Sequence, residues 1–176
     1  MYGQSVSPDK IERRDKLTFI KGSDIPYTGL VSDIHKNGKL KYEVQYKNGV
    51  KQGYYKSWYL SGKIECIKYY SNNKLIDVLN KWYENGQLER TVNFLDNKKN
   101  GKFETWYENG QKKEEGVYTN DLKSGIFIGW YDTGQKESEG NFVNGVEEGV
   151  HTQWYRSGKK FAELTYKNGE LISKKY

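Results

Sequence analysis

Trp82-Tyr-Glu-Asn-Gly-Gln87 is spelled again, residue for residue, at Trp106-Tyr-Glu-Asn-Gly-Gln111. The two copies lie 24 positions apart, and the tryptophans of the chain keep that interval throughout. They stand at Trp58, Trp82, Trp106, Trp130 and Trp154, and a tyrosine follows each one. A fixed period of this kind is the signature of a repeat protein.

Other residues recur with the same period. Ile34-His35 is a weaker sixth copy of the Trp-Tyr pair, 24 residues before Trp58. A glycine follows each position of the pair by four residues, and an aromatic residue follows it by twelve. A glycine also precedes it by five residues, with Asp77 as the exception. Six tandem repeats therefore fill residues 29–172, with bounds 29–52, 53–76, 77–100, 101–124, 125–148 and 149–172.

Each repeat is predicted to form one β-hairpin. Asn-Gly pairs such as Asn85-Gly86 supply the positive φ that tight turns need, and the flanking runs are rich in Trp, Tyr, Phe, Val and Thr, which favour strands. No stretch carries the apolar period of a helix. We expect an all-β chain, an elongated meander of about six antiparallel hairpins in one twisted, open sheet or solenoid. Residues 1–28 form an N-terminal extension and cap, with a strand at Lys16–Lys21, and residues 173–176 form a basic tail.

Two registers are open for the hairpin around Asn85-Gly86. A two-residue loop, which we favour for the Asn-Gly copies, places Tyr83 opposite Leu88 and position 77 opposite Phe94. A loop that also takes in Glu84, with Gly86 in a bulge, places Trp82 opposite Leu88 and on the face of Phe94. The Ser-Gly and Thr-Gly turns favour the bulged form, because Ser and Thr disfavour the left-handed conformation.

The repeated phrase resembles the MORN repeat variant of bacterial proteins. Its best copy runs from Gly101-Lys-Phe-Glu-Thr-Trp-Tyr-Glu-Asn-Gly110 to Tyr118-Thr-Asn120, and the resemblance covers residues 29–172. It implies a meander of hairpins that binds a partner, and several relatives are labelled antitoxin components. The departures are the Ile34-His35 copy, Asp77, and the pairs Asn72-Asn73, Asp96-Asn97 and Asn120-Asp121 where Asn-Gly is usual.

Composition limits the size of the core and leaves the cellular compartment open. Hydrophobic residues make up 35% of the chain, so a thick two-layer core is not expected, and its 16 tyrosines do much of the covering. Cys66 is the single cysteine, which excludes an internal disulfide and indicates a tolerated surface or half-buried thiol. No transmembrane segment or signal peptide is evident. The polar start would suit a chain whose leader has been removed, so we expect an exported or cell-envelope protein in that case and a cytoplasmic one otherwise.

The sequence predicts no catalytic, metal or cofactor site. His35 and His151 belong to repeats one and six, too far apart in an extended array to share a metal or a proton. His151 replaces an apolar residue of the sister repeats, so we interpret it as a packing residue. No phosphate loop, nucleophile elbow or zinc spacing occurs, and the carboxylates follow the repeat spacing. We therefore predict a protein that is not an enzyme and needs no cofactor.

Binding is the remaining function class. The tryptophans, in a ladder of aromatic rings, are candidate anchors for a partner, although the ladder is first of all expected to be the core. Residues 125–148 carry a net charge of −4, and we predict a dock there for a basic partner. Its residues are Asp132, Glu137, Glu139, Glu147 and Glu148.

Three partners remain open. The first hypothesis is a scaffold for protein–protein interaction, antitoxin-like or serving the cell envelope. The second is a glycan or cell-wall binding module that stacks sugars on the Trp/Tyr ladder. The third is anionic lipid bound by Lys36, Lys39, Lys41 and Lys47 of the basic front half. A nucleic-acid partner is not expected, and the sheet ends could pair edge to edge in a dimer.

Overall fold

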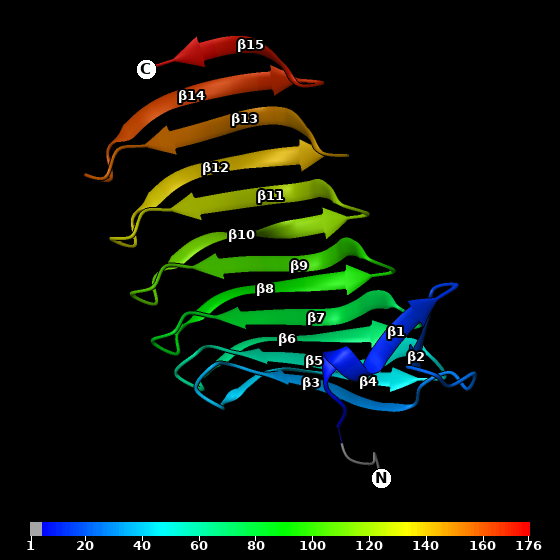
Figure 1. Cartoon of the computed structure of the whole chain (residues 1–176). Coiled ribbons are helices and arrows are strands. Elements are labelled where there is room, and N and C mark those ends of the chain that lie inside the picture. Colours follow the sequence, from blue (N-terminus) through cyan, green and yellow to red (C-terminus); the bar gives the residue numbers. More distant parts are fainter. Residues whose placement is uncertain (1–4) are drawn as a thin grey trace. The chain divides into compact units, whose positions relative to one another are not determined.

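The computed structural model describes residues 5–176 and is built almost entirely of strands (Figure 1). A 3-10 turn, η1 (Pro8–Lys10), is followed by a two-stranded sheet of β1 (Ile11–Arg14) and β2 (Leu17–Ile20). The larger sheet comprises β3 (Gly29–Ile34), β4 (Leu40–Lys47), β5 (Val50–Trp58), β6 (Ile64–Ser71), β7 (Lys74–Trp82), β8 (Leu88–Leu95), β9 (Lys98–Trp106), β10 (Lys112–Thr119), β11 (Leu122–Trp130), β12 (Lys136–Val143), β13 (Val146–Trp154), β14 (Lys160–Lys167) and β15 (Glu170–Lys175).

These thirteen strands follow one another in chain order as an open antiparallel meander, which confirms the predicted fold class. Twelve strands were expected from six hairpins. The thirteenth is β15, because positive φ angles at Asn168 and Gly169 turn the chain back once more. The strand therefore runs through most of the predicted tail. The chain divides into two compact units, Met1–Gly86 and Gln87–Tyr176.

Two kinds of turn alternate along the meander. The turns that connect one hairpin to the next are two-residue loops in which both residues have positive φ, as in Asn48 (49°) and Gly49 (80°). This is the geometry of a type I′ hairpin turn. Where the sequence departs from Asn-Gly, a side chain takes a new role: Asp121 keeps a φ of 70°, and its Oδ1 accepts a 2.8 Å hydrogen bond from the backbone N–H of Lys99.

The turns within repeats are bulged, so the two-residue loop that we favoured for the Asn-Gly copies is wrong. In the fourth repeat the Tyr107 N–H donates to the Gln111 carbonyl (2.8 Å), and Trp106 pairs with Lys112. Only Gly110 of the loop has positive φ (85°), whereas a type I′ turn needs two such residues. Asn109 instead uses its side chain, because Nδ2 donates to the Asp132 carbonyl at 2.7 Å.

A second bulge then restores the register of the other alternative. The pairing shifts between Lys112 and Glu114, so that Tyr118 faces Gly101, as the two-residue loop had predicted for the late aromatic and the leading glycine. Because of this compensation, Trp106 lies on the face opposite Tyr118. The bulged alternative is therefore right about the turn but wrong in placing tryptophan and the late aromatic on one face.

The N-terminal segment packs against the first repeat. Val6 pairs with Val31 of edge strand β3, and Ile11 of β1 packs on the cluster of Val31, Val44 and Tyr46. The expected strand at Lys16–Lys21 is β2, and its partner β1 was not foreseen. Residues 1–4 of the predicted cap lie outside the described residues.

Candidate functional site

One face of the sheet in the second unit carries a continuous ladder of aromatic rings, which we call the ring face. Successive rings meet edge to face with centroids 4.9–5.4 Å apart. The members are Phe103, Tyr118, Phe127, Phe142, His151 and Tyr166. Phe103 and Phe127 are buried and form a core cluster with Val92. This ladder is thus the core of the sheet in the second unit, but it contains none of the tryptophans that the sequence placed in it. Its closest rings are not available to stack on a ligand.

His151 is a packing member of this ladder. Its ring lies between Phe142 and Tyr166, and it is 9% exposed. Nε2 donates to the Asn141 carbonyl at 2.9 Å, and Nδ1 lies 3.7 Å from a carboxylate oxygen of Glu147. The imidazole therefore fills an aromatic position of the ladder while its Nε2–H is hydrogen-bonded to the backbone.

Three of the tyrosines that follow a tryptophan tie neighbouring repeats together. The hydroxyl of Tyr59 donates to the Trp82 carbonyl (2.6 Å), that of Tyr107 to Trp130 (2.8 Å) and that of Tyr131 to Trp154 (2.7 Å). His35 of the weaker first copy does the same through Nε2 to the Trp58 carbonyl, at 2.8 Å. The Trp-Tyr pair is therefore conserved between repeats partly for a hydrogen bond that the sequence interpretation missed.

The tryptophans are half-buried, and lysines of the adjacent strand lie over the rings of the second unit. The Lys112 Nζ is 6.0 Å from the ring centre of Trp106 and 5.8 Å from that of Trp130. Lys136 lies 5.7 Å from Trp154 in the same way. Trp58 and Trp82 are likewise half-buried, at the ends of β5 and β7. All five remain candidate anchors for a partner.

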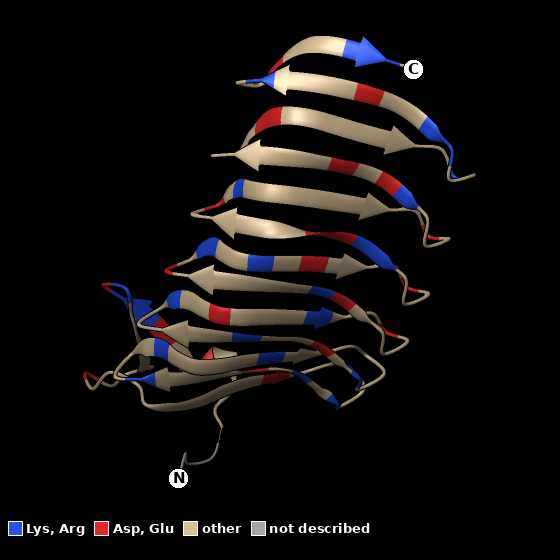
Figure 2. Ribbon diagram, turned by 180° about the vertical axis from the view of Figure 1, so that it is seen from behind, with Lys and Arg blue, Asp and Glu red and all other residues tan. Residues whose placement is uncertain are grey.

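The five predicted acidic residues are divided between the faces and a turn. Strand alternation places Glu147 on the ring face, since it pairs with Phe142, and Glu139 and Glu148 on the opposite face. Asp132 lies in a turn, where it pairs with Arg156, while Glu137 stands at the bulge of β12. Figure 2 shows Lys and Arg beside Asp and Glu on the same strands. The structure therefore does not bring these residues together as one acidic surface.

A buried carboxylate lies on the face opposite the ladder. Glu104 is 9% exposed, and the Nζ atoms of Lys102 and Lys112 each lie 2.8 Å from one of its carboxylate oxygens. Lys112 also contacts Glu115 at 2.6 Å. Burial acts to raise the pKa of Glu104, but the hydrogen bonds from Lys102 and Lys112 outweigh it and hold that pKa below the usual 4.5.

This network predicts a pH-dependent contribution to stability. Because the pKa of Glu104 is lower in the folded state than in the unfolded state, its ionised carboxylate stabilises the fold above about pH 4.5. This stabilisation is lost as the pH falls through the lowered pKa. Urea unfolding should therefore find Glu104→Gln less stable than the parent chain at about pH 7, with the difference shrinking toward about pH 3. Glu170→Gln, on exposed β15, is the control. A difference for Glu104→Gln that persists unchanged at acid pH would contradict this assignment.

A group of solvent-exposed aliphatic side chains lies on the face opposite the ladder in the second unit. Six aliphatic side chains there are 43–55% exposed, and strand alternation places them all on that one face. These residues, which we call the aliphatic surface, are Val117, Leu122, Ile126, Val143, Val146 and Val150. They come from four neighbouring strands, β10 to β13.

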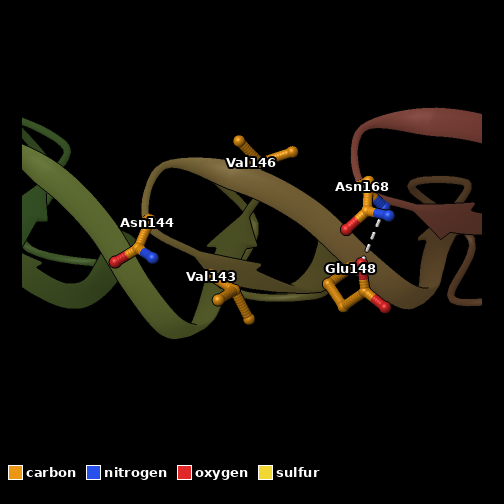
Figure 3. A pocket seen from close by; sticks show the side chains of 5 residues that line it. All are labelled: Val143, Asn144, Val146, Glu148 and Asn168. Atoms are coloured by element: carbon orange, nitrogen blue, oxygen red, sulfur yellow. Dashed lines mark hydrogen bonds between the residues drawn. The ribbon is translucent and has the colours of Figure 1, made fainter.

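A hollow of about 510 Å³ opens at the edge of the aliphatic surface (Figure 3). Val143 and Val146 line it beside Asn144, and the Glu148 carboxylate there accepts a 2.8 Å hydrogen bond from the Asn168 backbone N–H. The first repeat has an equivalent hollow of about 340 Å³, in which Gln52 takes the place of Glu148. Its recurrence shows that the hollow is a product of the repeat geometry.

Comparison with known protein families identifies the repeats. The model described as MORN repeat variant matches residues 27–48, 51–72, 78–96, 99–120, 123–144 and 147–168. The chain belongs to the MORN repeat variant family. MORN repeats are commonly modules for protein or membrane-lipid interaction and generally serve as non-enzymatic scaffolds. A comparison with curated proteins finds no match.

Three features of the described residues concern metal binding, membrane spanning and the single thiol. Within residues 5–176, no group of three or more His, Cys, Asp or Glu side chains is placed to hold a metal ion. No helix in the same range is long and apolar enough to cross a membrane. Cys66, the single cysteine, is half-buried on β6.

Proposed function

We propose that this MORN-variant chain is a non-enzymatic scaffold that binds a protein partner through the aliphatic surface of its second unit. The observation that carries the proposal is the gathering of six half-exposed aliphatic side chains on one face. These aliphatic side chains stand among polar neighbours such as Ser124, Asn141 and Glu148. Their number favours an interaction site, because a solvent-facing sheet normally carries polar residues there.

The tryptophans of this unit add anchors to the same face. Along β11, Leu122, Ile126 and Trp130 share one side by strand alternation, and along β13 Val146, Val150 and Trp154 do so. Tryptophan is enriched in protein-binding hot spots, so Trp130 and Trp154 are the anchors that we expect a partner to contact.

The geometry supports a protein partner better than a glycan. Sugar binding needs an open ring face, whereas the ladder rings pack edge to face on one another and lysines lie over Trp106, Trp130 and Trp154. For the lipid alternative, two of the four lysines are already engaged. Lys41 pairs with Asp33 at 3.2 Å, and Lys39 donates to the Ser61 carbonyl.

The identity of the partner would assign the biological role. A small toxin as partner would support the antitoxin-like role that we hypothesise from the sequence. A partner of the cell envelope would instead support the envelope-associated role that we hypothesise from the sequence.

Two lysine substitutions test the aliphatic surface. Ile126→Lys with Val150→Lys should fold normally, because Lys102 occupies the equivalent slot of the fourth repeat. Capture of the protein partner from extracts of the native host should fall by at least about tenfold, since each lysine would have to be desolvated in the interface. Quantitative mass spectrometry of the captured proteins measures this.

The matched control is Gln135→Lys with Ser157→Lys, which adds the same charge to exposed turns of the same unit. Circular dichroism should show the same strand content for both variants. If the control reduces capture as much as the surface variant does, or if neither reduces it, the aliphatic surface is not the binding site.

A further inference from the structure

Lys68 occupies an unusual position in the repeat. Ten residues after the Trp position, the other five repeats carry only aliphatic residues or glycine, namely Val44, Val92, Gly116, Gly140 and Leu164. Val44 and Val92 are 4% exposed, and both glycines are buried. Lys68 is itself half-buried. A charge in this row costs desolvation energy that no other repeat incurs.

The ammonium group of Lys68 lies over tyrosine rings of the first unit. Its Nζ is 4.4 Å from the ring centre of Tyr55 and 5.9 Å from that of Tyr70. Lys51 approaches the second ring as well, with its Nζ 5.1 Å from the centre of Tyr70. Two cations from β5 and β6 therefore share one aromatic platform.

Arg13 adds a third cation. It alternates with Glu12 along β1, so it shares the side of Ile11, which packs on the cluster of Val31, Val44 and Tyr46. Burial lowers the pKa of Lys51, and the positive charges of Lys68 and Arg13 lower it further. The three cations are thus close enough to repel one another.

Carboxylates of the chain do not neutralise this cluster. Across residues 5–176, Arg13, Lys51 and Lys68 take part in no ion pair. The acidic groups nearby have other partners: Asp33 pairs with Lys41 at 3.2 Å, and Glu65 accepts a 3.0 Å hydrogen bond from the Ser57 hydroxyl. Cations that no carboxylate of the chain neutralises attract an anion from outside it.

We propose that Arg13, Lys51 and Lys68 bind carboxylate side chains of an acidic segment in a partner protein, with Tyr55 and Tyr70 as the floor of the site. Charge complementarity defines the partner. Alternate side chains of an extended segment are about 7 Å apart, so two of its carboxylates can each meet one of the lysines that share the Tyr70 ring. The site lies in the first unit and does not depend on the aliphatic surface proposed above.

Direct binding of an acidic peptide tests the site. The probe is a fluorescein-labelled peptide of about ten glutamates, and fluorescence anisotropy with the full chain measures its affinity. Binding should weaken with added salt. Lys68→Val and Lys51→Leu should each weaken it by about tenfold or more. Both variants copy residues that sister repeats already carry in the same slots, Val92 and Leu75.

Lys99→Leu is the matched control. Lys99 occupies the slot of Lys51 and lies over the Phe103 and Tyr118 rings, 5.6 and 4.7 Å from their centres. The substitution removes the same charge from the same kind of platform, so affinity should change by no more than about twofold. Equal weakening by Lys99→Leu would show general attraction by the basic chain and would overturn the site.

Two further measurements separate the alternatives. Without peptide, Lys68→Val should raise the melting temperature, because it removes a half-buried charge; a lower melting temperature with unchanged peptide binding would make Lys68 structural and overturn the proposal. Tighter binding to phosphatidylserine vesicles or to a single-stranded oligonucleotide than to the peptide would also overturn it. If the acidic peptide does not bind, the predicted effect of Ile126→Lys with Val150→Lys on partner capture still stands, so the two proposals are tested independently.

Discussion

Phe127→Ala is expected to lower the free energy of unfolding by about 3 kcal/mol, the low end of the range for a buried phenylalanine. The ring is 5% exposed and meets Tyr118 and Phe142 edge to face, each at 5.4 Å. The side chains packed around Phe127 among the described residues all belong to the same sheet face, so the space that the ring leaves would stay unfilled. Thermal melting followed by circular dichroism, together with urea unfolding, measures the loss.

Ile126→Ala is the matched control for this prediction. The two residues are adjacent on β11, but Ile126 points to the opposite face and is 51% exposed. Its truncation should cost less than about 1 kcal/mol, because little buried area is lost. Similar losses for both variants would mean that the ladder is not the core of the second unit.

The period of the sequence was enough to predict the hairpins. A tryptophan every 24 residues, with glycine and asparagine at fixed offsets, allows only a short strand between successive turns. The register could not be predicted in full, because two bulges compensate each other. One follows Tyr107 at the turn, and the other falls at Lys113, where the sequence carries no glycine as a signal. Each alternative was therefore correct for one end of the hairpin.

The candidate surfaces show a second limit of sequence interpretation. Glu139, Glu147 and Glu148 are close in the chain, yet strand alternation sends Glu147 to one face and the other two to the opposite face. Alternation could have revealed the aliphatic surface, since Leu122, Ile126 and Ile128 all lie an even number of residues before Trp130 and so share its side of the strand. That signal was hidden because the register decides which face is already occupied by the ladder.

A glycine stands five residues before the Trp-Tyr position in every repeat except the third, where Asp77 replaces it. Substitution of this glycine is expected to have a large effect on stability. Gly149 has a φ of 79°, and a Cβ built on it would meet nothing within 4 Å. Space is therefore available, and the backbone conformation is what requires glycine. Asp77 holds the same slot at a φ of 61°, since aspartate tolerates this region better than other side chains.

Gly149→Asp is accordingly expected to lower the free energy of unfolding by less than about 1 kcal/mol, and Gly149→Val by about 2 kcal/mol, because a β-branched residue is strained at positive φ.

Gly116 is required for the opposite reason, which is lack of space. It has an ordinary φ, but a Cβ there would lie 2.5 Å from the Phe127 ring. Even Gly116→Ala should therefore cost about 1–3 kcal/mol through overpacking. Urea unfolding of the three variants gives the comparison. A Gly149→Asp variant as unstable as Gly149→Val would show that the slot is limited by space and not by the backbone, and Asp77 would then need another explanation.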